Sequence, residues 1–166
     1  MSKCITSQYL FFAFANTTPL DEIRFILETK RLNKAAAERS FKGNYGHELG
    51  KILKSSKSEE QILGSYTFTH ILSYTSAACD ARMAGAMIPV MSNSGSGNQG
   101  ITATLPVVVY AEDNHKSEEE LIRALTLSHL TAIFIQWCGG GKIVHFPQVQ
   151  LRLFCILIAG GGSLFV

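Results

Sequence analysis

The sequence has few charged residues and no long apolar run. Lysine, arginine, aspartate and glutamate make up 17% of the 166 residues and the formal net charge is +2, whereas hydrophobic residues make up 46%. This composition excludes an intrinsically disordered chain, and so small a net charge does not provide the basic surface of a nucleic-acid-binding protein. The apolar stretch 153–159 is far shorter than the ~20 residues that span a bilayer. We therefore expect a globular domain that binds neither nucleic acid nor membranes.

Cysteine is also scarce, and the four cysteines are widely separated. They lie at positions 4, 79, 138 and 155, so the chain has neither a CxxC pair of the kind that binds zinc nor a disulfide framework. The segment 1–18 contains one lysine and no clear cleavage site for a signal peptidase. These features predict free thiols in a cytoplasmic protein, and they provide no candidate metal ligand.

Acidic residues are missing from the C-terminal part of the chain. No aspartate or glutamate follows Glu120, two triple-glycine runs occur at 139–141 and 160–162, and 149–153 alternates like a strand. We expect an irregular or short-strand tail over 137–166, separate from a main domain over 1–136.

Most of the remaining sequence has the periodicity of α-helices, which predicts a mainly α fold. Helix formers and apolar residues spaced by three or four positions predict helices over 20–39, 48–53, 59–84 and 121–136, the last preceded by a capping box at 117–120. The small residues at 76–78 would let a second helix approach closely. The apolar segment 101–111 contains Pro106 and fits either a buried, kinked helix or a buried strand, a choice that periodicity does not decide.

The segment between Met91 and Gly100 is rich in glycine and in neutral polar residues. Its glycines allow positive φ angles and close approach to a ligand, and a helix that starts near Asn98 would add free amide groups that suit a carboxylate or phosphate. No lysine follows the last glycine as in a Walker A loop, and no clear strand precedes the segment as in a Rossmann unit. The alternative is a flexible surface linker. The candidate ligand-binding residues are Asn93, Ser94, Gly95, Ser96, Gly97, Asn98 and Gln99, expected in one irregular segment that opens a helix beside a pocket.

Three polar residues outside this segment have two possible roles each. Asp80 and Arg82 either orient the glycine-rich segment or form a structural ion pair at the end of a helix. His129 lies on an apolar helix face, which favours a core histidine over a catalytic base.

The string Ser92-Asn-Ser-Gly-Ser-Gly-Asn-Gln-Gly-Ile101, within the longer segment 77–109, resembles the core of the bacterial L-cysteine desulfidase family. That family is related to the alpha chain of iron–sulfur-dependent L-serine dehydratase. Further resemblance at 14–25, 42–46 and 124–133 extends the similarity over about 14–135.

The resemblance implies a helical, cytoplasmic lyase domain that binds an amino acid through the glycine-rich segment. In this family three cysteines hold a [4Fe–4S] cluster with one open iron, which acts as a Lewis acid on the β-substituent. Elimination gives pyruvate and ammonia, together with sulfide when L-cysteine is the substrate; the resemblance leaves the choice between L-cysteine and L-serine open.

The chain departs from the family pattern where the cluster ligands would lie. It has no Gly-Cys-Thr-Glu-Pro stretch, and Gln136-Trp-Cys-Gly-Gly-Gly-Lys142 stands where a Leu-Ser-Ala-Leu-Cys-Gly segment would follow. Cys138 is therefore out of context, Cys79 fits core packing, and Cys4 and Cys155 lie outside the similarity. We expect a fragment that holds no cluster and is inactive alone. The alternatives are a non-catalytic remnant of a broken gene, one subunit of a split enzyme that needs a complementing chain, or a homo-oligomer.

Overall fold

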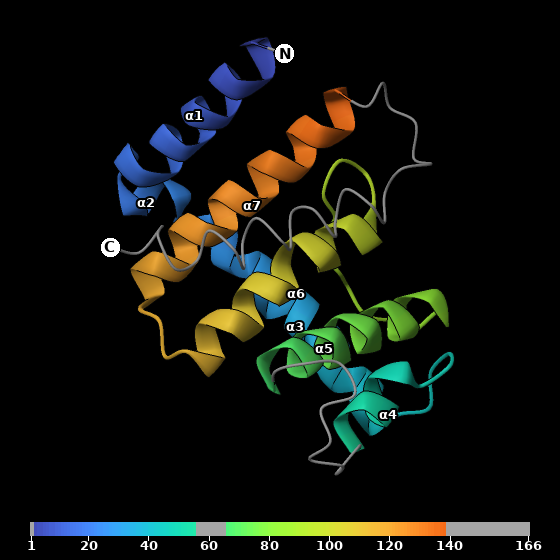
Figure 1. The fold of residues 1–166 in the computed structure, drawn as a ribbon. Coiled ribbons are helices and arrows are strands. Elements are labelled where there is room, and N and C mark those ends of the chain that lie inside the picture. The colour runs from blue at the N-terminus through green and yellow to red at the C-terminus, as the bar shows by residue number, and fades with distance from the viewer. Residues whose placement is uncertain (1, 56–65, 139–166) are drawn as a thin grey trace.

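The computed structural model describes residues 2–55 and 66–138, with side chains for 9–55 and 66–136. Helices follow one another along the described chain, and no strand occurs within it, which confirms a mainly α fold (Figure 1). Residues 139–166 of the expected tail and the start of the helix expected over 59–84 lie outside the described residues, whereas 137 and 138 continue α7. The elements are α1 (Ser2–Thr17), α2 (Leu20–Ile23), η1 (Arg24–Ile26), α3 (Leu27–Lys42), α4 (Leu49–Ser55), α5 (Tyr66–Met83), α6 (Gly97–Asp113) and α7 (Glu118–Cys138).

Helix α6 is the central element, with α7 on one side and α5 on the other, and it also contacts α3 (Figure 1). It contains the apolar segment 101–111, so the helix alternative for that segment is confirmed. Apolar side chains surround nearly the whole helix, and such a helix is stable only when other elements cover it on all sides. Its first half packs through Ile101 and Leu105 against α3 and α5, and its second half packs through Val107 and Val108 against η1 and α7.

Small side chains bring α3, α4 and α5 close together. Ala36 and Ala37 of α3 pack against Ala77 and Ala78 of α5, and all four are essentially inaccessible to solvent. The close approach expected from the small residues at 76–78 is therefore confirmed.

The helix expected over 20–39 forms, but a turn of 3-10 helix at η1 interrupts it. The capping box is confirmed: the Ser117 amide donates to Glu120 Oε2 over 2.8 Å, and the Glu120 amide donates to Ser117 Oγ over 3.2 Å. Helix α1 was not predicted, because its sequence lacks an amphipathic period. Among the described helices, none is long and apolar enough to span a membrane.

Candidate functional site

The glycine-rich segment begins with a tight turn over Asn93–Ser96. The Asn93 amide donates to Ser96 O over 3.0 Å, and the Ser96 amide donates to Asn93 O over 2.9 Å. Ser94 and Gly95 have φ angles of 49° and 80°. Positive φ at both central positions is the geometry of a type I′ turn, which bends the chain back sharply. The turn leaves Ser94 and Gly95 at its tip.

Helix α6 starts directly after this turn. The side chain of Ser96 caps the helix by accepting a hydrogen bond from the Gln99 amide over 3.3 Å. Gly97, Asn98 and Gln99 therefore form the first helical turn, and the irregular segment ends at Ser96, earlier than expected. The amides of a first helical turn have no partners within the helix, and the helix dipole makes this end positive.

A cation lies against this positive helix end. The Arg82 guanidinium donates to Asn98 Oδ1 over 2.9 Å, and it lies so close to Gly97 that a Cβ at that position would overlap with Arg82 Nε. The ion pairs found within 9–55 and 66–136 do not include Arg82. Two positive features thus face each other, an arrangement that an anion would stabilise.

Asp80 and Arg82 do not pair with each other in this arrangement. Asp80 Oδ2 accepts the amide of Leu49 over 3.0 Å and so fixes the start of α4 against α5, while Arg82 contacts α6. The two residues are two positions apart but contact different elements. Asp80 contacts the start of α4, which is a structural role, and Arg82 contacts the glycine-rich segment.

A buried hydrogen-bond network fixes the turn to helix α7. Asn93 Nδ2 donates to both His129 Nδ1, over 3.0 Å, and His129 O, over 3.1 Å. Because two acceptors face this nitrogen, the Asn93 amide orientation is defined, and His129 Nδ1 must be unprotonated. The ring proton is therefore on Nε2, which lies 3.0 Å from Thr104 Oγ1.

The network continues from Thr104 to α3 and to the segment that precedes the turn. Asn33 Nδ2 donates to Thr104 Oγ1 over 3.1 Å, and Asn33 Oδ1 accepts the Met91 amide over 2.9 Å. Thr104 in turn donates to Gly100 O over 2.7 Å, so its single proton and both acceptor positions are used. Both the chain before the turn and the helix after it are thereby fixed to α3 and α7.

His129 is a buried and uncharged member of this network. Burial lowers the pKa of His129 to about 4, and both ring nitrogens already have partners. The interpretation as a core histidine fits this placement. Asn33 and Thr104 were missed by sequence reasoning, because a single buried polar residue in a helix gives no periodic signal.

Gln99 contributes one buried oxygen that has no hydrogen-bond partner among the described residues. Its Nε2 donates to Asn93 Oδ1 over 3.0 Å, whereas Oε1 is buried without a hydrogen bond, and the residue is 3% exposed. Such an atom costs free energy unless a water or another donor reaches it. Gln99 is the member of the segment with unused hydrogen-bonding capacity in the interior.

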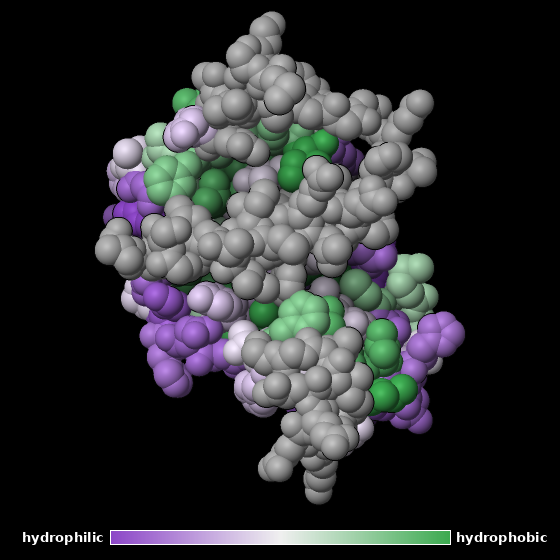
Figure 2. Space-filling model, in the orientation of Figure 1, coloured by the Kyte–Doolittle hydropathy of each residue, from purple (hydrophilic) through white to green (hydrophobic). Residues whose placement is uncertain are grey.

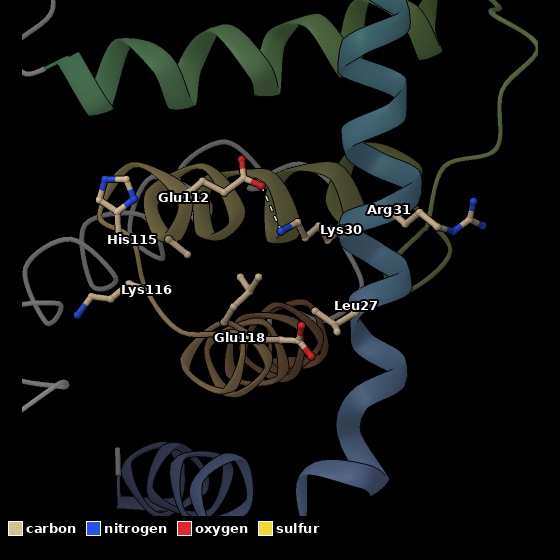
Figure 3. A pocket seen from close by; sticks show the side chains of 9 residues that line it. Leu27, Lys30, Arg31, Glu112, His115, Lys116 and Glu118 are labelled. Atoms are coloured by element: carbon tan, nitrogen blue, oxygen red, sulfur yellow. Dashed lines mark ion pairs between the residues drawn. The ribbon is translucent and has the colours of Figure 1, made fainter.

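A surface pocket of about 590 Å³ lies at the opposite end of α6 (Figure 3). Lys30 and Glu112 line it and form an ion pair at 3.1 Å, Arg31 pairs with Glu28, and Lys116 pairs with Glu120. Its charges are therefore largely compensated within the chain. The pocket expected beside the glycine-rich segment stays a prediction.

The cysteine chemistry of the described residues does not fit an iron–sulfur cluster. Cys79 packs against the cluster of Ala77, Ile101 and Leu105, and burial raises the pKa of its thiol to about 11, so a thiolate is disfavoured. Within the described side chains, no three histidine, cysteine or acidic residues converge as metal ligands.

Comparison with known proteins adds the family context. The family model described as serine dehydratase alpha chain matches residues 4–137. A UPF0597 protein of Phocaeicola vulgatus is 95% identical over 152 residues, which cover 92% of this chain and 34% of that relative. The corresponding protein of Bacteroides thetaiotaomicron is 74% identical over 152 residues, with the same coverage of 92% and 34%. The UPF0597 protein YhaM of Salmonella paratyphi B is 50% identical over 150 residues, covering 90% of this chain and 32% of its own.

The chain thus spans about a third of the length of the curated relatives it matches. No solved structure matches it significantly.

Proposed function

Because the chain belongs to the serine dehydratase alpha-chain family, we propose that it supplies the substrate-binding loop of a lyase that eliminates the β-substituent of a small L-amino acid. The loop is the segment Asn93–Gln99, and the group that it binds is the α-carboxylate of the substrate. The resemblance noted above to the L-cysteine desulfidases supports L-cysteine and L-serine as the substrates to test.

The observation that carries this proposal is the position of Arg82. Its guanidinium lies against Gly97 at the positive end of α6, where a cation is unfavourable in the absence of an anion. A carboxylate in this place would accept hydrogen bonds from Arg82 and from the amides of Gly97 and Asn98. Charge-assisted hydrogen bonds of this kind are the strong ones in protein recognition.

The other residues of the loop orient the substrate rather than react with it. The hydroxyl of Ser94, at the tip of the turn, donates to Asn93 Oδ1 over 3.0 Å, so it can accept a hydrogen bond from the amino group of a substrate. Elimination removes the Cα proton together with the β-hydroxyl or β-thiol, which leaves as water or hydrogen sulfide. The resulting aminoacrylate tautomerises to an imine, which water hydrolyses to pyruvate and ammonia. His129 is not the base in this proposal, because its two ring nitrogens are engaged and its pKa is about 4.

A second proposal concerns activity. We infer that these 166 residues bind substrate without turning it over on their own, because they correspond to 34% of the Phocaeicola vulgatus relative and lack the cysteine-bearing stretches that the family resemblance implies. One subunit of a split enzyme and a non-catalytic remnant of a broken gene both fit this inference, and a complementing chain that restores turnover would favour the split enzyme.

The test is calorimetric titration of the chain with L-serine, L-cysteine and L-serinamide, which lacks the carboxylate. We expect the two amino acids to bind and L-serinamide to bind at least tenfold more weakly. Arg82→Gln should weaken L-serine binding by about tenfold, which corresponds to ~1.4 kcal/mol for the lost charge. Arg31→Gln is the matched control, since Arg31 pairs with Glu28 on its own helix. Equal binding of L-serine and L-serinamide would contradict the proposal.

A further inference from the structure

Helix α1 is attached to the rest of the molecule along a single face. The rings of Phe11 and Phe134 meet edge to face with their centroids 5.5 Å apart, and Ala15, one turn further on, is 1% exposed. In Figure 1 the helix lies alongside α7, on the side of α7 away from α6. Among the described residues, it is the side of α1 facing α7 that is covered in this way.

The position of α1 is fixed by a specific contact as well as by packing. Arg123 of α7 donates from Nη1 to Ala15 O and to Asn16 O, both over 2.9 Å. These carbonyls belong to the last turn of α1, where the helix dipole is negative and a cation is favourable. The helix is therefore an integral element of the fold.

The outer face of α1 is apolar and uncovered. Tyr9 and Leu10 are 73% and 67% exposed, Phe12 and Phe14 are also exposed, and 9–17 contains no charged residue. Figure 2 shows hydrophobic atoms at the surface over the C-terminal half of this helix. A helix that is apolar on all sides belongs in a protein interior, and an uncovered apolar patch marks an interaction site.

The comparisons indicate what covers this face. The family match includes almost all of α1, so the helix is part of the family fold, yet this chain corresponds to only 34% of the Phocaeicola vulgatus and Bacteroides thetaiotaomicron relatives. We infer that the outer face of α1, defined by Tyr9, Leu10, Phe12 and Phe14, docks the remaining two thirds of the family's chain through a complementary apolar surface. This inference does not depend on ligand binding by the loop.

The test is co-expression of this chain with a separate polypeptide that comprises the unmatched part of the Phocaeicola vulgatus relative. We expect a one-to-one complex by size-exclusion chromatography with light scattering. The double change Tyr9→Glu and Leu10→Glu should weaken the complex at least tenfold. Tyr66→Glu is the matched control, because Tyr66 is 75% exposed and lies on α5, which packs mainly against α3, α4 and α6.

A photo-crosslinking amino acid at Leu10 provides a measurement that does not depend on how the charged variants fold. Crosslinks to the complementing polypeptide support the inference. A complex that tolerates the double change, the absence of any complex, or crosslinks only between copies of this chain would each overturn it.

Discussion

Gly100 lies where the first turns of α6 pass the backbone of Met91. A Cβ at this position would overlap with the carbonyl oxygen of Met91, which is backbone and does not swing aside. We expect Gly100→Ala to lower the free energy of unfolding by about 3 kcal/mol, since the chain before the turn has to move away from Asn33. Urea denaturation measures this change.

Gly85 provides the control for this substitution. It has a φ angle of 77°, but a Cβ there would meet no atom within 4 Å. Gly85→Ala should therefore cost only about 1 kcal/mol, the strain of a left-handed backbone. Equal effects of the two substitutions would mean that the close approach of α6 to Met91 is not important for stability.

The titration of His129 makes the stability of the protein depend on pH. Its folded-state pKa of about 4 lies below the ordinary value of 6.5, so the unfolded chain takes up a proton first as the pH falls. The stabilisation that depends on a neutral His129 is therefore fully present above about pH 6.5. Between pH 6.5 and 4 the free energy of unfolding falls by about 3 kcal/mol in total. His129→Gln should show a flatter stability profile between pH 7 and 5, measured by urea denaturation at each pH. The account of a buried neutral imidazole fails if both proteins give the same profile.

Sequence reasoning found the ligand-binding candidates but not the residues that hold them. Gly95, Ser96 and Gly97 follow one another in the sequence, and few local structures require glycine and serine at such density. The structure places these residues in one turn and at the start of helix α6. Asn33 and Thr104 are separated from the loop in the sequence, and only the packing of α3, α6 and α7 brings them together. A long-range hydrogen bond of this kind leaves no local pattern.

At the scale of helices, the end of α1 depends on one residue of α7. Arg123 donates to the carbonyls of Ala15 and Asn16 and also pairs with Glu119 on its own helix. We expect Arg123→Gln to increase amide hydrogen exchange in α1 by about tenfold, because ~1.4 kcal/mol of local stabilisation is removed. Exchange in α5 should not change.

Lys30→Gln is the control for this element, since its partner Glu112 joins α3 to α6 and not to α1. If exchange in α1 is unaffected by Arg123→Gln, the packing of Phe11 and Ala15 alone fixes the helix.

The helices themselves were largely predictable because capping and periodicity are local. The capping box at Ser117 and Glu120 marks the start of α7 directly. Helix α1 was missed because its apolar residues do not repeat with an amphipathic period. The sequence around Pro106 left the choice between helix and strand open because its β-branched residues favour strands. In the structure this segment is helical, as part of α6, and it is buried between three other helices.

At the scale of the whole molecule, the chain covers about a third of the length of its relatives, and two features of its described residues support the proposals made above. Arg82 lies against the loop and takes part in none of the ion pairs of the described side chains, and the apolar outer face of α1 is exposed. The proposed division at residue 136 and the tail over 137–166 stay predictions. The central claim is that the loop Asn93–Gln99 binds the carboxylate of an amino acid.

The most direct measurement is a titration of the ¹⁵N-labelled chain with L-serine, followed through the amide signals of Gly95, Gly97 and Asn98 by NMR. The account predicts saturable shifts at these amides, and none of comparable size with L-serinamide. Shifts confined to the pocket that Lys30 and Lys116 line, or no saturable shifts at all, would contradict it.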